Sequence, residues 1–256
     1  MKELLMALPA GRETGGRAFG LTPAHMAYRV GPGPRLLGIQ LPPGLRGGLM
    51  QVDCAGFDGA GDPVGCCRQI LGEVRRRSFR GIVCDFEGMP SGCLGKMVEI
   101  LDRNCAAQGW TLYVPESYAP QAPQARVLIP SALTHGTLER RLREAAERYG
   151  AGRTTLAVEW VREDFPLPAR GRGEPIPRET LEEMLRRLEP AVFFDKGLCA
   201  HYFTYMKGPQ AHFVLFDTPR SIREKLEAAK RLGIAAALLP QPEIEPHFDE
   251  IFGANT

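Results

Sequence analysis

The sequence has 256 residues, of which 44% are hydrophobic and 24% are charged, with 32 Lys and Arg against 30 Asp and Glu. These fractions are typical of a globular chain, and they exclude disorder, collagen or a coiled coil as a description of the whole. The net charge of +2 gives no indication of a nucleic-acid partner or of an anionic membrane surface.

Short apolar runs predict three strands in the first part of the chain, over residues 4–8, 36–41 and 49–54. Stretches rich in Gly and Pro separate them, and no clear helical pattern lies between them. This part of the sequence therefore predicts strands without showing how they are connected.

From residue 65 onward one unit recurs: an amphipathic helix, a glycine, and a short apolar strand. The apolar spacing predicts helices over 65–77, 91–107, 137–149 and 221–232, the last capped by Ser221. The strands are expected over 82–87, 110–115, 127–131, 154–160 and 234–239. Continuous apolar strands of this kind are typical of parallel sheets that are covered on both faces.

Alternating strands and helices predict an α/β fold, and the chain length with up to eight strands favours a (β/α)8 TIM barrel over an open doubly wound sheet. Residues 166–178 read as a long exposed loop, and 201–206 with 212–216 as a hairpin inserted before the last helix. No domain-scale linker is visible, so a single domain over residues 1–256 is expected.

Cysteine and histidine usage gives no indication of a metal site or a cofactor. The seven cysteines are odd in number and form no Cys-x-x-Cys pair, which predicts reduced thiols, and the five histidines lack ligand spacing. No nucleotide-binding glycine motif is present. The apolar run at the N-terminus is too short for a signal peptide or a membrane span, so a cytoplasmic protein is expected. The oligomeric state cannot be read from the sequence.

Two carboxylates at the end of a predicted strand are the strongest candidates for catalysis. Side chains alternate along a strand, so Asp85 and Glu87 should share one face while Ile82, Cys84 and Phe86 pack against helices. Active sites of barrels lie at the carboxyl ends of their strands. Close, partly desolvated carboxylates cannot both ionise easily, and the one that keeps its proton can protonate a leaving group.

Residues 80–87, Arg-Gly-Ile-Val-Cys-Asp-Phe-Glu, are similar to the fourth-strand signature of glycoside hydrolase family 18, Asp-Gly-x-Asp-x-Asp-[Trp/Phe/Tyr]-Glu. Residues 216–239 resemble the family's closing helix and eighth strand, and 110–115 its fifth strand. The resemblance is clearest over residues 81–240, and it is nearest to chitinases and to spore cell-wall N-acetylglucosaminidases. It implies a barrel that hydrolyses N-acetylhexosamine glycans, such as peptidoglycan or chitin-type chains.

In that family the substrate's own acetamido oxygen attacks the anomeric carbon. By resemblance, Glu87 would be the acid and Asp85 the partner of the acetamido group. The chain departs from the signature at Arg80 and Val83, each of which stands where the family has an Asp. It also has Val-Leu-Ile-Pro-Ser at 127–131 in place of a Met-x-Tyr, and Leu-Pro-Gln at 239–241 in place of a Trp.

Other side chains near predicted strand ends are candidates for binding the sugar. These candidates are polar or aromatic residues: Tyr113, Glu116, Ser131, Glu159, Trp160 and Gln241. Two further possibilities stay open at this point. One is a catalytically silent barrel that binds glycan or takes part in a sporulation-related assembly, and the other is an unrelated barrel chemistry that uses the same carboxylates.

Overall fold

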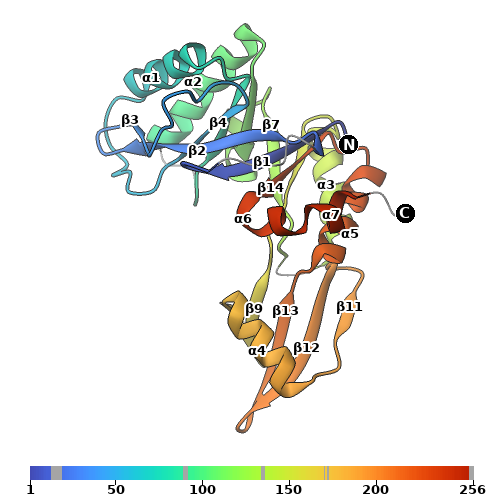
Figure 1. Cartoon of the computed structure of the whole chain (residues 1–256). Coiled ribbons are helices and arrows are strands. Elements are labelled where there is room, and N and C mark those ends of the chain that lie inside the picture. The colour runs from blue at the N-terminus through green and yellow to red at the C-terminus, as the bar shows by residue number, and fades with distance from the viewer. Residues whose placement is uncertain (13–18, 89–91, 134–135, 170, 172, 254–256) are drawn as a thin grey trace.

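The computed structural model describes residues 1–12, 19–88, 92–133, 136–169, 171 and 173–253. Its main body is a parallel barrel, and a smaller lobe built on an antiparallel sheet extends from one side of it (Figure 1). The described helices include none long and apolar enough to cross a membrane.

Eight parallel strands close the barrel within the part of the chain that the structure describes. In barrel order they are β1 (Glu3–Pro9), β2 (Thr22–Gly31), β4 (Leu49–Asp53), β5 (Gly81–Asp85), β6 (Thr111–Pro115), β7 (Arg126–Pro130), β8 (Thr154–Ala157) and β14 (Ala236–Pro240). Strand β1 pairs with both β14 and β2, which completes the ring. The predicted (β/α)8 barrel is therefore confirmed.

Helices cover much of the outside of the barrel. They are α1 (Pro63–Arg76) after β4, α2 (Gly92–Gln108) after β5, α3 (Leu138–Tyr149) after β7 and α5 (Pro219–Arg231) before β14. A short antiparallel strand, β3 (Arg35–Gly38), follows β2, and the turn η2 (Glu116–Gln121) follows β6, at two places where a regular barrel has a helix. After β14 the described chain ends in α6 (Gln241–Ile244), η3 (Glu245–His247) and α7 (Phe248–Phe252).

Three apolar clusters hold the barrel together. The first joins α1 and α2 to strands β2, β4, β5 and β6, and the second joins α3, α5 and α7 to β1, β7, β8 and β14. The third fills the barrel interior and consists of Leu5, Ala24, Leu49, Val83, Tyr113 and Leu128, with Ala157 and Leu238 against it. Because residues two apart share a face of a strand, this cluster identifies the inward-facing positions, among them Gln51, Asp53 and Asp85.

The lobe, residues 162–216, lies between β8 and α5. Its sheet has the order β10 (Glu174–Pro175), β9 (Arg162–Pro166), β13 (Gln210–Phe216), β12 (Ala200–Lys207) and β11 (Phe193–Asp195). Helix α4 (Arg178–Leu188) covers one face of this sheet through Leu181 and Met184. The lobe is thus larger than the predicted hairpin, which is present as β12 and β13.

Several predicted elements need correction. Strand β2 was not expected, since Pro23, His25 and Arg29 interrupt its apolar pattern. Helix α4 was not expected either, and the predicted loop over 166–178 contains the short strand β10. Thr218, not Ser221, is the N-cap of α5. Ser221 is the third helical residue, and its side chain accepts a hydrogen bond from the Thr218 backbone N–H. A single domain over residues 1–256 stays a prediction.

Candidate active site at the carboxyl ends of the barrel strands

The barrel brings polar side chains from three adjacent strands to its carboxyl end. Asp53 on β4 is in register with Asp85 on β5, and Arg29 on β2 is in register with Asp53. The Arg29 guanidinium binds the Asp53 carboxylate through two contacts, of 2.6 and 3.2 Å. Of the two carboxylates Asp53 and Asp85, Asp53 is therefore paired with a neighbouring cation, Arg29.

Asp85, the last residue of β5, has a different environment. Its side chain is partly buried, and its Oδ2 accepts a hydrogen bond of 3.0 Å from Gln51 Nε2. Burial raises the pKa of the Asp85 carboxyl; the Gln51 bond opposes this, and the charges of Glu87 and Asp53 add to the increase. The site thus contains a carboxyl group whose charged form is disfavoured.

Glu87 lies two residues beyond the end of β5, and it is exposed. The residue before it, Phe86, is 2% exposed and packs its ring against Tyr118, with centroids 5.8 Å apart. This contact anchors the segment that carries Glu87. The predicted strand over 82–87 therefore ends at Asp85, and Glu87 stands on the following loop.

The outward face of β5 behaves as predicted. Ile82, Cys84 and Phe86 all belong to the apolar cluster that includes α1 and α2. Complete burial raises the pKa of the Cys84 thiol well above its ordinary value, so this thiol is a packed group and not a nucleophile.

Two neighbours of the carboxylates were not identified from sequence. Gln51 lies on β4, and its bond to Asp85 joins residues 34 positions apart. Cys54 follows β4 and is half-buried; the backbone of Glu87 hydrogen-bonds its sulfur, while burial raises the pKa of the thiol. In sequence, Gln51 is a single polar residue within an apolar strand and Cys54 is a single cysteine just after it, and neither is a signal by itself.

Tyr113, a predicted sugar-binding residue, is fully buried inside the barrel. Its hydroxyl donates to Glu3 Oε2 at 2.9 Å and accepts from Arg126 at 2.8 Å, and both residues belong to the amino-terminal half of their strands. Its ring is part of the interior packing, which speaks against the expected stacking on a sugar at the opposite end, and that role stays a prediction.

Three other candidates are engaged in bonds between barrel elements. Glu116 accepts from Arg141 on α3 and from Tyr149 Oη, the latter at 3.2 Å. Ser131, 2% exposed, accepts from the Glu159 backbone N–H at 2.9 Å and so joins the ends of β7 and β8. The Glu159 carbonyl oxygen also accepts from Lys225 Nζ at 3.3 Å. These contacts hold the rim of the barrel together.

The last two candidates lie near β14 and the lobe. Trp160 is half-buried and stacks on His247, with centroids 5.3 Å apart, in a cavity of about 200 Å³ that Arg162 and Glu243 also line. Gln241 is 3% exposed, and its Nε2 donates to Glu245 on η3. Of the six, Trp160 is the aromatic side chain placed beside open space.

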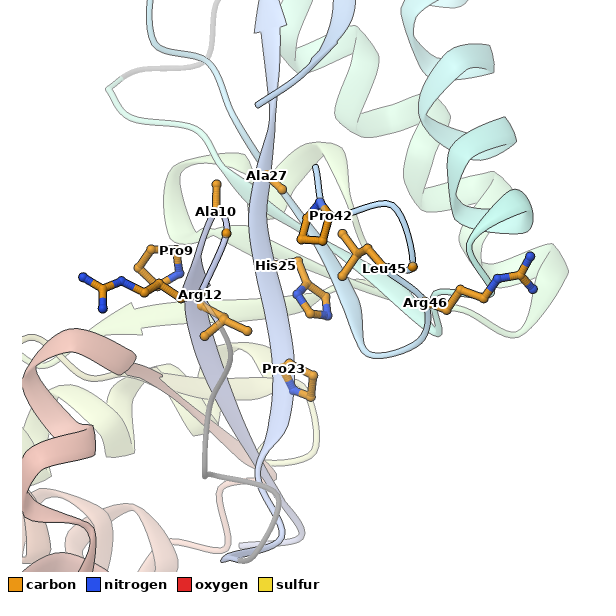
Figure 2. Close-up of a pocket in the computed structure, with 12 residues that line it drawn as sticks. Pro9, Ala10, Arg12, Pro23, His25, Ala27, Pro42, Leu45 and Arg46 are labelled. Atoms are coloured by element: carbon orange, nitrogen blue, oxygen red, sulfur yellow. The ribbon is translucent and has the colours of Figure 1, made fainter. Parts of the chain in front are cut away.

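A larger cavity, of about 430 Å³, lies elsewhere. It is formed by the outward side of β1 and β2 and by the loop over 42–46, and Figure 2 shows His25, Leu45 and Arg46 around it. His25 and Ala27 point away from the barrel interior because they alternate with the inward Ala24. This cavity therefore belongs to the outside of the barrel and not to the site around Asp85.

Among the residues that the structure describes, no group of three His, Cys, Asp or Glu side chains is placed to hold a metal ion. The chemistry available at the carboxyl end is that of Asp85, Glu87 and Asp53, with Gln51 and Arg29 as donors. Such an arrangement can exchange a proton with a bound ligand and can stabilise a developing positive charge.

Comparison with solved structures identifies the same architecture in proteins of distant sequence. A chitinase from Chromobacterium violaceum aligns with a TM-score of 0.72 and 16% identity, over 98% of each chain. The spore cortex-lytic enzyme SleL of Bacillus megaterium aligns with a TM-score of 0.67 and 15% identity, over 98% of this chain and 74% of its own. A class V chitinase of Pseudomonas fluorescens gives 0.71 and 13%, over the full length of both.

The fold is that of chitinases and spore cortex-lytic enzymes. The resemblance to glycoside hydrolase family 18 is thereby confirmed at the level of the fold. No protein-family model matches the sequence, and no curated protein matches it in a sequence search. The likeness therefore lies in the architecture, and the activity has to be argued from the residues of the site.

Proposed function

We propose that this protein is a divergent glycosidase that hydrolyses N-acetylhexosamine glycans, with Glu87 as the general acid. The observation that carries the proposal is the pairing of a partly buried, hydrogen-bonded Asp85 with an exposed Glu87 at the carboxyl end of a barrel strand. Barrel enzymes place their chemistry at this end of the strands. The architecture shared with chitinases and SleL supports the substrate class.

The reaction assigns one role to each carboxylate. Glu87 donates its proton to the glycosidic oxygen as the bond from that oxygen to the anomeric carbon breaks. The carbonyl oxygen of the substrate's acetamido group forms the new bond to the anomeric carbon, and Asp85 stabilises the positive charge that this group acquires. Water then opens the ring so formed and gives a proton to the Glu87 carboxylate, which restores the acid.

The different exposures of the two residues support these roles. Glu87 stands on a loop in contact with solvent, so it can reach a leaving-group oxygen and recover its proton from water. Asp85 is partly buried and fixed by Gln51, so it can orient an acetamido group without changing position.

Glu87→Gln tests the proposal because it keeps the shape of the side chain and removes the acidic proton. Release of reducing sugar from peptidoglycan and from N-acetylglucosamine oligomers should fall by about 100-fold or more, the usual contribution of a positioned general acid. Glu183→Gln, at an exposed position of α4, is the matched control and should retain the wild-type rate. Equal rates in Glu87→Gln and wild type would contradict the assignment.

The second candidate function is a barrel that binds such glycans without cleaving them, in a spore or another assembly. The internal bonds of Tyr113, Ser131 and Gln241 favour it, because these side chains use their polar groups within the protein. Oligomer binding measured by calorimetry, with no reducing sugar released by wild type or Glu87→Gln, would support this function. For either function we propose action inside the cell or spore, on recycled or cortex fragments.

A further inference from the structure

Gln51 is a buried amide with one satisfied end. The side chain is 4% exposed, and its Nε2 donates to Asp85 Oδ2 at 3.0 Å. Its Oε1 is buried and has no hydrogen-bond partner among the described residues. An unpaired buried acceptor destabilises the fold, so a purely structural residue at this position would be better apolar.

The position of Gln51 in the barrel gives the reason for its bond. Gln51 is in register with Val83, which precedes Asp85 by two residues and faces the same interior. Val83 offers Asp85 no hydrogen bond, so the strand that carries Asp85 supplies no polar neighbour at this level. The adjacent strand β4 supplies one, through a side chain long enough to reach across.

We propose that Gln51 is a positioning residue for Asp85, and that its amide holds the Asp85 carboxylate in the orientation that the reaction uses. The inference rests on the proposed function, in which Asp85 supports the acetamido group. The amide suits both protonation states: Nε2 donates to the carboxylate, and after rotation Oε1 accepts from the protonated acid. The unpaired Oε1 is the end that the charged form of Asp85 leaves unused.

Other charged groups near Asp85 also change the pKa of its carboxyl group. Asp53 from β4 and Glu87 from the following loop both raise the pKa of Asp85, and Arg29 from β2 is engaged by Asp53. The bond from Gln51 is the contact that lowers this pKa. Removing Gln51 and removing the charge of Asp53 should therefore shift the titration of Asp85 in opposite directions.

The test is a carbon-13 NMR titration of the Asp85 carboxyl in wild type, Gln51→Met and Asp53→Asn. Methionine keeps the length of the side chain but lacks the donor, so the pKa of Asp85 should rise in Gln51→Met. In Asp53→Asn it should fall. An unchanged Asp85 titration in folded Gln51→Met would overturn the proposal, because a residue that only fills space would not affect it.

A second measurement needs no variant. In nitrogen-15-labelled wild type, the side-chain amide signals of Gln51 should titrate together with the Asp85 carboxyl, and signals that do not respond would overturn the proposal. Neither titration uses a substrate, so its result does not depend on the Glu87→Gln activity test, and the two proposals can fail separately. If the enzyme passes that test, the acidic limb of its kcat/KM profile should move to higher pH in Gln51→Met.

Discussion

At the scale of single residues, Asp85 is a carboxyl group whose charged form its surroundings disfavour. Burial raises its pKa above the ordinary Asp value of about 3.9 that it has in the unfolded chain. A group with a raised pKa favours folding below the unfolded value, and this benefit is lost as the pH rises through the folded value. Functional sites commonly retain such unfavourable groups.

We therefore expect Asp85→Asn to raise the Tm at pH 7, because asparagine has no charge to desolvate and can still accept from Gln51. The difference from wild type should disappear below about pH 4, where both states of the wild-type residue are protonated. Thermal unfolding followed by circular dichroism at several pH values measures it. A lower Tm of Asp85→Asn at pH 7 would show that the charged form stabilises the fold.

At the scale of elements, Gly81 determines how closely β5 approaches β6. A Cβ atom on Gly81 would collide with the carbonyl oxygen of Thr111, the residue paired with it. This explains physically why the strand that carries Asp85 begins with glycine.

Gly81→Ala should lower the free energy of unfolding by about 1–3 kcal/mol or more, since two backbones must separate. The matched control is Gly72→Ala in α1, where a Cβ meets no atom within 4 Å. There alanine should stabilise the helix by about 1 kcal/mol. Urea denaturation of both variants measures the contrast, and equal effects would contradict the close approach of β5 and β6.

A buried ion pair fixes the base of the lobe to the barrel. Lys225 on α5 donates to Asp217 at 2.6 Å, and the two side chains are 1% and 0% exposed. Asp217 also accepts a hydrogen bond from the Val161 backbone N–H, and Lys225 also donates one to the Glu159 carbonyl oxygen. The pair therefore joins the end of β13 to the segment that follows β8.

Lys225→Met should destabilise the protein by about 3–5 kcal/mol, because it leaves the Asp217 charge buried without a counter-ion. Lys230→Met on the same helix, where the side chain is 62% exposed, should change stability by about 0.5 kcal/mol or less. Adding Asp217→Asn to Lys225→Met should recover part of the loss. If the single and double variants unfold at the same urea concentration, the uncompensated charge is not the cause.

At the scale of the whole molecule, the sequence predicts the barrel well where local signals agree. Apolar runs such as 82–86, and the glycines just past α2, α3 and α5, define β5, α2, β6, α3 and β8, and later α5 with β14. Strand β2 and helix α4 carry mixed patterns, so their assignment depends on the sheets that they join. Tertiary context overrides local preference there.

Of the candidate site, only the residues on or next to a single strand could be predicted from the sequence. Asp85 and Glu87 follow from the signature that covers β5 and the start of the next loop, but the bond from Gln51 spans 34 residues. Tyr113 shows the same limit, since its inward direction follows from alternation while its hydroxyl partner Glu3 lies 110 residues away. Closure of the barrel creates these contacts, and no local pattern encodes them.

The measurement that tests the central claim most directly is proton NMR of the anomeric signals during cleavage of N-acetylglucosamine oligomers, with de-N-acetylated oligomers as the comparison. Attack by the acetamido oxygen and then by water inverts the anomeric carbon twice, so we predict a first product of retained configuration. We also predict no cleavage of the de-N-acetylated oligomers. A product of inverted configuration, or equal rates on both oligomers, would contradict the roles given to Glu87 and Asp85.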